Sequence, residues 1–125
     1  MAATSYSRIL LIEDNHDTAD TLRMLLEIVG YDVQVSYSGT AGVRVACEWV
    51  PDIVVSDIGL PDLTGYEVAS QLRQNQVTAN IPLIAVTAYD SEEDRRQAFA
   101  HGFDYHLTKP AETEALLGLL AQVSK

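Results

Sequence analysis

Five short apolar runs alternate along this chain with five segments whose apolar residues recur at helical spacing. The third run, 53–55, leads to the carboxylate of Asp57, and Gly59 and Pro61 follow at once. A short continuous run of β-branched residues is typical of a strand buried on both faces of a parallel sheet. Regular alternation of strand and helix predicts a parallel sheet with helices on both faces and right-handed crossovers. The predicted fold class is therefore α/β, a doubly wound (βα)5 arrangement.

The apolar pattern and the helix-capping residues predict where each element lies. Strands are expected over residues 8–13, 31–35, 53–57, 81–87 and 105–107, and each is followed by a helix. Thr64 and Glu67 have the spacing of a capping box, and Gly30 and Gly102 stand where a left-handed residue ends a helix. Ser38 and Ser91 are expected to begin the second and fourth helices, and Ala111 the fifth. The residues expected to face the sheet are Ala19, Leu22, Leu26, Val29, Ala41, Val45, Ala46, Trp49, Val68, Ala69, Leu72, Leu116, Leu117 and Leu120.

Length and composition exclude several classes of protein. The 125 residues suit one domain, 1–125, with an ordered core over about 7–124. Eight basic against eighteen acidic residues give a net charge of −10, which argues against nucleic acid or an anionic membrane as a direct partner and suits a bound cation. The single cysteine, Cys47, excludes an internal disulfide and a cysteine metal cluster. Without an apolar run of membrane-spanning length or a signal peptide, we expect a cytoplasmic protein.

Polar side chains stand where the predicted strands end. Glu13 and Asp14 follow the first strand, Asp57 the third, Thr87 the fourth and Lys109 the fifth. The carboxyl ends of parallel strands lie along one edge of the sheet, where ligands of such folds bind. Clustered carboxylates repel one another unless a cation lies among them, and hard oxygen ligands suit Mg²⁺. A lysine and a threonine beside a metal can hold an anion such as a phosphoryl group.

Each of these residues also has an ordinary structural interpretation. A turn acid, a helix cap or a surface lysine would need no function. Five of them at matching strand ends favour a site over five separate coincidences.

The chain resembles the receiver domain of two-component response regulators over nearly its full length. The resemblance is carried by the segments 10–15, 55–61 with Gly65, 85–88, and Lys109 with Pro110. The segment 102–110 is most similar to receivers fused to hybrid sensor kinases. The resemblance implies a flavodoxin-like sheet in the order 2-1-3-4-5, an order that the apolar pattern alone does not determine.

The resemblance also implies a function for the strand-end residues. Asp57 is implied as the phosphoacceptor, with the phosphoryl group bound by Thr87 and Lys109. The implied Mg²⁺ ligands are the carboxylates of Glu13, Asp14 and Asp57 and the main-chain carbonyl of Gly59. The bond between Lys109 and Pro110 is implied to be cis. Such a domain catalyses its own phosphorylation and dephosphorylation only and is not a turnover enzyme.

Partners follow from the same resemblance. The phosphoryl donor would be a histidine kinase or a histidine phosphotransfer domain, and the output would be a downstream protein or a fused output domain. The expected output surface is the fourth helix, fifth strand and fifth helix, where Arg95 and Arg96 stand among acids and Leu119 lies at the edge of an apolar stripe, a combination that suits a transient interface. The chain would be a monomer or a weak phosphorylation-dependent dimer.

The sequence departs from the family pattern at a few positions. The family usually has Tyr or Phe three residues before the lysine, with a rotamer that follows the threonine, whereas this chain has His106 preceded by Tyr105. The switch residues are therefore Thr87 with His106 or Tyr105. Gly59 and Tyr89 occupy positions that tune phosphoryl lifetime, and Ala111 stands where Phe is frequent.

Three alternatives belong to other classes. A flavodoxin needs a phosphate-binding loop after the first strand, where Glu13 and Asp14 would repel phosphate. A haloacid-dehalogenase-type phosphatase needs a second aspartate where this chain has Gly59. A receiver-like docking module that never takes phosphate would not need Asp57, Thr87 or Lys109.

Overall fold

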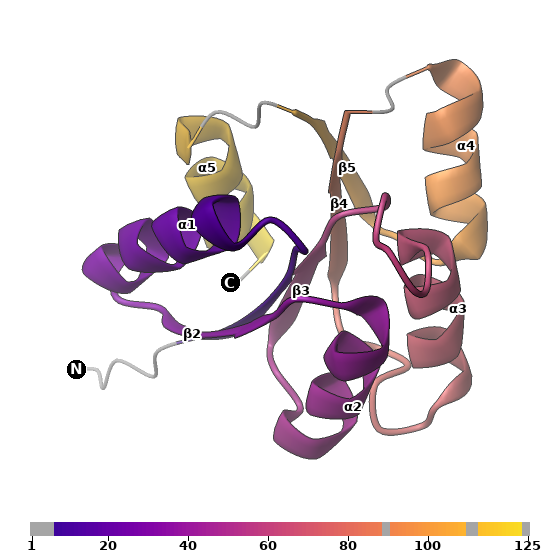
Figure 1. Ribbon diagram of the computed structural model, residues 1–125, viewed down its shortest axis with the longest axis horizontal. Helices are drawn as coiled ribbons and strands as arrows, with labels where there is room; N and C mark the ends of the chain where they lie inside the picture. The colour runs from indigo at the N-terminus through magenta and orange to yellow at the C-terminus, as the bar shows by residue number, and fades with distance from the viewer. Residues whose placement is uncertain (1–6, 89–90, 110–112, 124–125) are drawn as a thin grey trace.

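The computed structural model of the protein describes residues 7–88, 91–109 and 113–123. Strand and helix alternate through this part of the chain (Figure 1). The strands are β1 (Arg8–Ile12), β2 (Asp32–Ser36), β3 (Ile53–Ser56), β4 (Leu83–Thr87) and β5 (Tyr105–Thr108). The helices are α1 (His16–Val29), α2 (Gly39–Trp49), α3 (Gly65–Gln74), α4 (Glu92–His101) and α5 (Thr113–Val123). All paired strands are parallel, in the order β2-β1-β3-β4-β5, which confirms the expected (βα)5 fold and strand order.

The sheet separates two layers of helices. Helices α1 and α5 cover one face, and α2, α3 and α4 cover the other (Figure 1). Alternate side chains of one strand therefore enter different cores: Leu10 and Ile12 pack on the α2–α3 side, whereas Ile9 and Leu11 pack on the α1–α5 side. Strands β3 and β4 are buried along their whole length, as expected for central strands of a parallel sheet.

The helix ends follow the capping residues closely. The side chains of Asn15, Ser38, Thr64 and Ser91 each accept a hydrogen bond from a main-chain N–H of the first turn. The Thr64 capping box with Glu67 is confirmed, and Ser91 and Asp94 form a second one. Gly30 and Gly102 end α1 and α4 with φ angles of 116° and 118°. In the described ranges, no helix is long and apolar enough to cross a membrane.

Several details of the sequence-based assignment differ from the structure. Strands β2 and β4 begin later than expected, at Asp32 and Leu83. Val29 does not face the sheet, because it is the last residue of α1 and its side chain is 56% exposed. Gly42, which the sequence analysis did not select, is buried on α2 and lies against β1: a Cβ there would lie 2.4 Å from Cδ1 of Ile12. The expectations for Tyr89, the cis bond at Pro110 and the helix start at Ala111 fall outside the described residues.

Candidate functional site

Glu13, Asp14, Asp57 and Lys109 meet at the carboxyl edge of the sheet, beyond the ends of β1 and β3. Ile12 pairs with Ser56, so Glu13 and Asp57 are the next residues of two neighbouring strands. The ladder continues by one bond, in which Asp57 N–H donates to the Ile12 carbonyl over 2.9 Å. Because the chain leaves β1 towards β2 and later returns to β3 on the other side of β1, the carboxyl ends of β1 and β3 mark the topological switch point, where doubly wound folds bind ligands.

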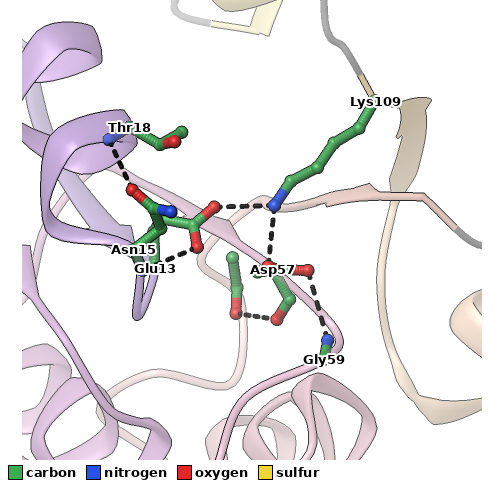
Figure 2. Close-up of polar contacts among 7 residues, drawn as sticks. Glu13, Asn15, Thr18, Asp57, Gly59 and Lys109 are labelled. Carbon is green, nitrogen blue, oxygen red and sulfur yellow. Dashed lines mark hydrogen bonds and ion pairs between the residues drawn. The ribbon is translucent and has the colours of Figure 1, made fainter.

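Lys109 reaches the same point from β5. Its N–H donates to the Thr87 carbonyl over 2.8 Å, which aligns the ends of β4 and β5. Its Nζ lies 2.8 Å from Oε1 of Glu13 and 2.8 Å from Oδ2 of Asp57 (Figure 2). The side chains are only 12% and 11% exposed for the two acids and 29% for the lysine. One ammonium therefore bridges two largely buried carboxylates.

Burial and the neighbouring charges shift the pKa values of Glu13 and Lys109. Burial raises the pKa of Glu13, and the nearby Asp57 charge adds to that effect, against the lowering influence of its bonds with Lys109 and the Asn15 N–H. Burial opposes the charged form of Lys109, but its bonds to Asp57 and Glu13 outweigh burial, and the pKa of Lys109 rises. The two carboxylates that Lys109 bridges thus favour its charged form.

Three carboxylates are close enough to share one cation. Oxygen atoms of Glu13, Asp14 and Asp57 all lie within 4.8 Å of one another, and Asp14 is exposed to water. Carboxylate oxygens with open access for water are the donor set that Mg²⁺ prefers. The donor set therefore fits Mg²⁺, with Asp14 at the side that faces solvent.

Asp57 is held in place by its own loop. Its Oδ1 accepts a hydrogen bond from Gly59 N–H over 3.2 Å, and its carbonyl accepts one from the Ser56 hydroxyl over 2.8 Å. Gly65 N–H donates to the Ile58 carbonyl over 2.8 Å. A Cβ on Gly65 would lie 2.5 Å from the Asp57 carbonyl oxygen, so only glycine allows the start of α3 to approach this closely.

Sequence reasoning missed a further carboxylate in this loop. Asp62 lies apart from the acid cluster and binds the first turn of α2, accepting from Gly39 N–H over 2.8 Å and Thr40 N–H over 2.9 Å. Its partners are 22 and 23 residues away along the chain. An acid next to Pro61 in a polar loop resembles an ordinary turn residue, so the sequence carries no local sign of this contact.

The strand register separates the two candidates for the switch residue. Thr87, which is fully buried, pairs with Thr108, and Ala85 pairs with His106. Because side chains alternate along a strand, His106 shares a face of the sheet with Thr87. Tyr105 lies on the opposite face and packs in the α1–α5 core. The geometry therefore favours His106 over Tyr105 as the partner of Thr87.

The expected output surface includes an exposed aromatic residue, Phe99, that the sequence analysis did not select. Arg95 and Arg96 are exposed on α4, and Arg96 pairs with Glu93 over 2.9 Å. Phe99 on the same helix is 50% exposed. Leu119 on α5 is partly buried against the α1–α5 core, so it contributes more to packing than its expected place at the edge of the apolar stripe implied.

Residues 9–121 match the family described as the response regulator receiver domain. The chain belongs to this family. Receiver domains are signalling switches of two-component systems and not turnover enzymes on external substrates, and they interact with histidine kinases or phosphotransfer proteins and with output domains.

Curated relatives fall into two sizes. The chain is 38% identical over 110 residues to the DNA-binding dual master transcriptional regulator RpaA of Synechocystis, which covers 88% of this chain but 46% of that protein. It is 36% identical over 111 residues to Protein PilH of Pseudomonas aeruginosa, covering 89% of this chain and 92% of that protein. The receiver thus spans about half the length of the first relative and nearly all of the second.

Solved structures agree with the fold. The chemotaxis response regulator CheY4 of Vibrio cholerae superposes with a TM-score of 0.90 at 25% identity, covering 95% of this chain and 99% of that one. The receiver domain of the sensor histidine kinase PA1611 of Pseudomonas aeruginosa has a TM-score of 0.88 at 29% identity and covers 97% of this chain and 100% of that one. The structure of that receiver was solved with a magnesium ion coordinated in its active-site cleft.

Proposed function

We propose that this receiver is a phosphoacceptor switch that takes a phosphoryl group onto Asp57 from a histidine kinase or a phosphotransfer domain. The observation that carries the proposal is the ion pair of Lys109 with both Asp57 and Glu13 at the carboxyl ends of β1 and β3. An ammonium aimed at a strand-end aspartate is placed to bind an oxygen of any phosphoryl group that joins it. A docking module that never takes phosphate would not need an ammonium aimed at Asp57.

The proposed step is an in-line displacement. A carboxylate oxygen of Asp57 attacks phosphorus, a new O–P bond forms, and the bond to the donor breaks with its electron pair leaving on the donor nitrogen. Glu13, Asp14, Asp57 and the Gly59 carbonyl would hold Mg²⁺, which would neutralise negative charge on the transferring group. Lys109 supplies a second positive charge and moves part of its pairing from Asp57 to the new phosphoryl oxygens.

The proposed signal leaves the site through β4 and β5. Thr87 would bond a phosphoryl oxygen, and His106, on the same face, would follow it. This change alters the surface of α4, β5 and α5, where the exposed Phe99 and Arg95 are available to a partner. The partner is proposed to be a downstream protein or an output domain of a longer chain.

A chemical test identifies the modified residue. The protein is incubated with acetyl phosphate and Mg²⁺, reduced with borohydride, and digested for peptide mass spectrometry. An acyl phosphate is reduced to an alcohol, so position 57 is expected to appear as homoserine. Modification at another residue would contradict Asp57 as the acceptor, and no modification with Mg²⁺ present would favour the phosphorylation-independent docking module.

A further inference from the structure

We infer that Asp62 is a positioning residue for the metal-binding loop, because it fastens that loop to the first turn of α2. The inference rests on the proposed function, in which the Gly59 carbonyl is a Mg²⁺ ligand. In this inference, the β2–α2 junction helps to set the metal affinity, although it has no side chain in the acid cluster.

The contact is more than an ordinary helix cap. Helix α2 already has a local cap, since the Ser38 hydroxyl accepts from Ala41 N–H over 3.2 Å. Asp62 adds a second carboxylate with both oxygens engaged, one on Gly39 N–H and one on Thr40 N–H. Hydrogen bonds between a carboxylate and the free N–H groups of a helix start are charge-assisted and are strengthened by the helix dipole. The hydrogen bonds from Thr40 and Gly39 also lower the pKa of Asp62 well below its usual range, so the anchor is charged at neutral pH.

A close approach of the two main chains supports the same contact. Gly39 is buried, and a Cβ there would lie 2.8 Å from Leu63 Cβ and 2.8 Å from the Leu63 carbonyl oxygen. The loop after β3 therefore rests directly on the start of α2, and a side chain at position 39 would push it away.

The anchored segment leads straight to the proposed ligand. Leu60 N–H donates to the Ile58 carbonyl over 3.0 Å, so Gly59 is the central residue of a three-residue turn. Ile58 and Leu60 are buried on either side of it, while Gly59 itself is exposed. Pro61, with its fixed φ, connects this turn to Asp62. Asp62 thus fixes the position of the chain where it leaves the 58–60 turn. The direction of the Gly59 carbonyl depends on that position.

The test compares two ways of weakening the same helix start. Asp62→Asn removes the negative charge of the loop anchor and one of its two acceptor oxygens, whereas Ser38→Ala removes the local cap of α2 and leaves the loop bonds in place. Glu48→Gln serves as a control for the loss of one negative charge, because Glu48 is exposed near the other end of α2. Gly39→Ala displaces the loop without changing any charge.

Two readouts separate positioning from stability. Amide hydrogen exchange without metal is expected to quicken at Gly59 by about tenfold in Asp62→Asn and Gly39→Ala, but only near Ala41 in Ser38→Ala. Calorimetric titration with Mg²⁺ is expected to give about tenfold weaker binding in Asp62→Asn and Gly39→Ala and unchanged binding in Ser38→Ala and Glu48→Gln.

The outcomes distinguish this inference from the proposed function. Equal Mg²⁺ affinity in Asp62→Asn and wild type, or equal weakening in Asp62→Asn and Ser38→Ala, would overturn the positioning role while the wild type still takes phosphate on Asp57. Absence of Mg²⁺ binding in the wild type would overturn both. Faster exchange at Gly59 in Asp62→Asn, together with weaker Mg²⁺ binding, would support the inference.

Discussion

The ammonium of Lys109 lies 2.8 Å from Oδ2 of Asp57 and pairs in addition with Glu13, so the proposed phosphoacceptor is already ion-paired. The lysine, which follows β5, is ion-paired with carboxylates that follow β1 and β3. Its positive charge opposes the repulsion among the three neighbouring carboxylates at these strand ends. Phosphorylation would give this lysine a more highly charged partner without requiring it to move far.

Lys109→Ala is expected to take some phosphate onto Asp57 but to transmit the change poorly. The lysine is the point charge that connects the phosphoryl group to β5. The measurement is the change in amide chemical shifts of α4 and β5 when beryllium fluoride, a phosphoryl mimic, is added with Mg²⁺. Shifts of equal size in the variant and the wild type would contradict this role, and Lys109→Arg should retain part of the response.

Asp14→Ala is expected to melt at or above the wild-type temperature in EDTA and to gain much less from Mg²⁺. At ~4 Å and an effective dielectric constant of ~20, two like charges repel by about 4 kcal/mol, and relaxation, solvent and Lys109 reduce this to about 1–2 kcal/mol. A ligand that binds only the folded state stabilises it by about 2.7 kcal/mol at one hundred times its dissociation constant. Melting curves at fixed ionic strength, with EDTA and with Mg²⁺, test both statements.

Asp14→Ala and Asp57→Ala are expected to behave differently in this melting experiment. Asp14 is exposed, so its removal relieves repulsion, whereas Asp57 also bonds Lys109 and Gly59 N–H. In Asp57→Ala, the stability lost with these hydrogen bonds should therefore offset the stability gained from reduced repulsion among the carboxylates. A clear drop in melting temperature for Asp14→Ala in EDTA would contradict the repulsion argument.

Gly65→Ala is expected to destabilise the fold and to impair phosphorylation. The new Cβ would lie 2.5 Å from the Asp57 carbonyl oxygen and 2.6 Å from Ile58 Cα, so the main chain must shift, at a cost of about 1–3 kcal/mol. Gly118→Ala is the matched control, because its Cβ would meet nothing within 4 Å on α5. There alanine should stabilise the helix by up to about 1 kcal/mol. Denaturant unfolding measures both, and equal effects would refute the close-packing account.

Much of this fold could be predicted, because local pattern and global structure agree. Buried β-branched runs, capping residues and helix-ending glycines each follow from short-range physics, so β3, the Thr64 box and Gly102 were predicted correctly. The acid cluster was predictable for a similar reason: parallel strands bring Glu13 and Asp57 to one edge whatever the details of packing. Long-range contacts between loops and helices could not be predicted from the sequence. Asp62 meets Gly39 only because two loops lie side by side, and the burial of Gly42 depends on how closely α2 approaches Ile12.

The pH dependence of stability should reveal the Asp62 anchor. Its pKa is depressed in the folded state, chiefly by hydrogen bonds from Thr40, so the unfolded chain takes up a proton first as pH falls. The anchor therefore contributes its full stability above the ordinary pKa of 3.8 and loses it progressively below that value. Urea unfolding should show Asp62→Asn less stable than wild type near neutral pH, with a difference that narrows below about pH 4. A constant difference down to the lowest pH would contradict the linkage.

Phe99→Ser is expected to reduce binding of a downstream partner, or phosphorylation-dependent self-association, without lowering stability by more than about 0.5 kcal/mol. Phe99 is half exposed, whereas Leu119 is packed, so Leu119→Ser should unfold more easily. Light scattering with and without beryllium fluoride, alongside melting curves, separates the two. Unchanged association in Phe99→Ser, where the wild type responds to the mimic, would remove α4 from the output surface.

The central claim is that Asp57 accepts a phosphoryl group with the help of Mg²⁺, and intact mass spectrometry tests it most directly. Wild type and Asp57→Asn are incubated with acetyl phosphate in Mg²⁺ or in EDTA and measured without delay. The account predicts one phosphoryl adduct on the wild type in Mg²⁺, strongly reduced in EDTA and missing from Asp57→Asn. An adduct that persists undiminished in Asp57→Asn, or a wild type that stays unmodified in Mg²⁺, would contradict it.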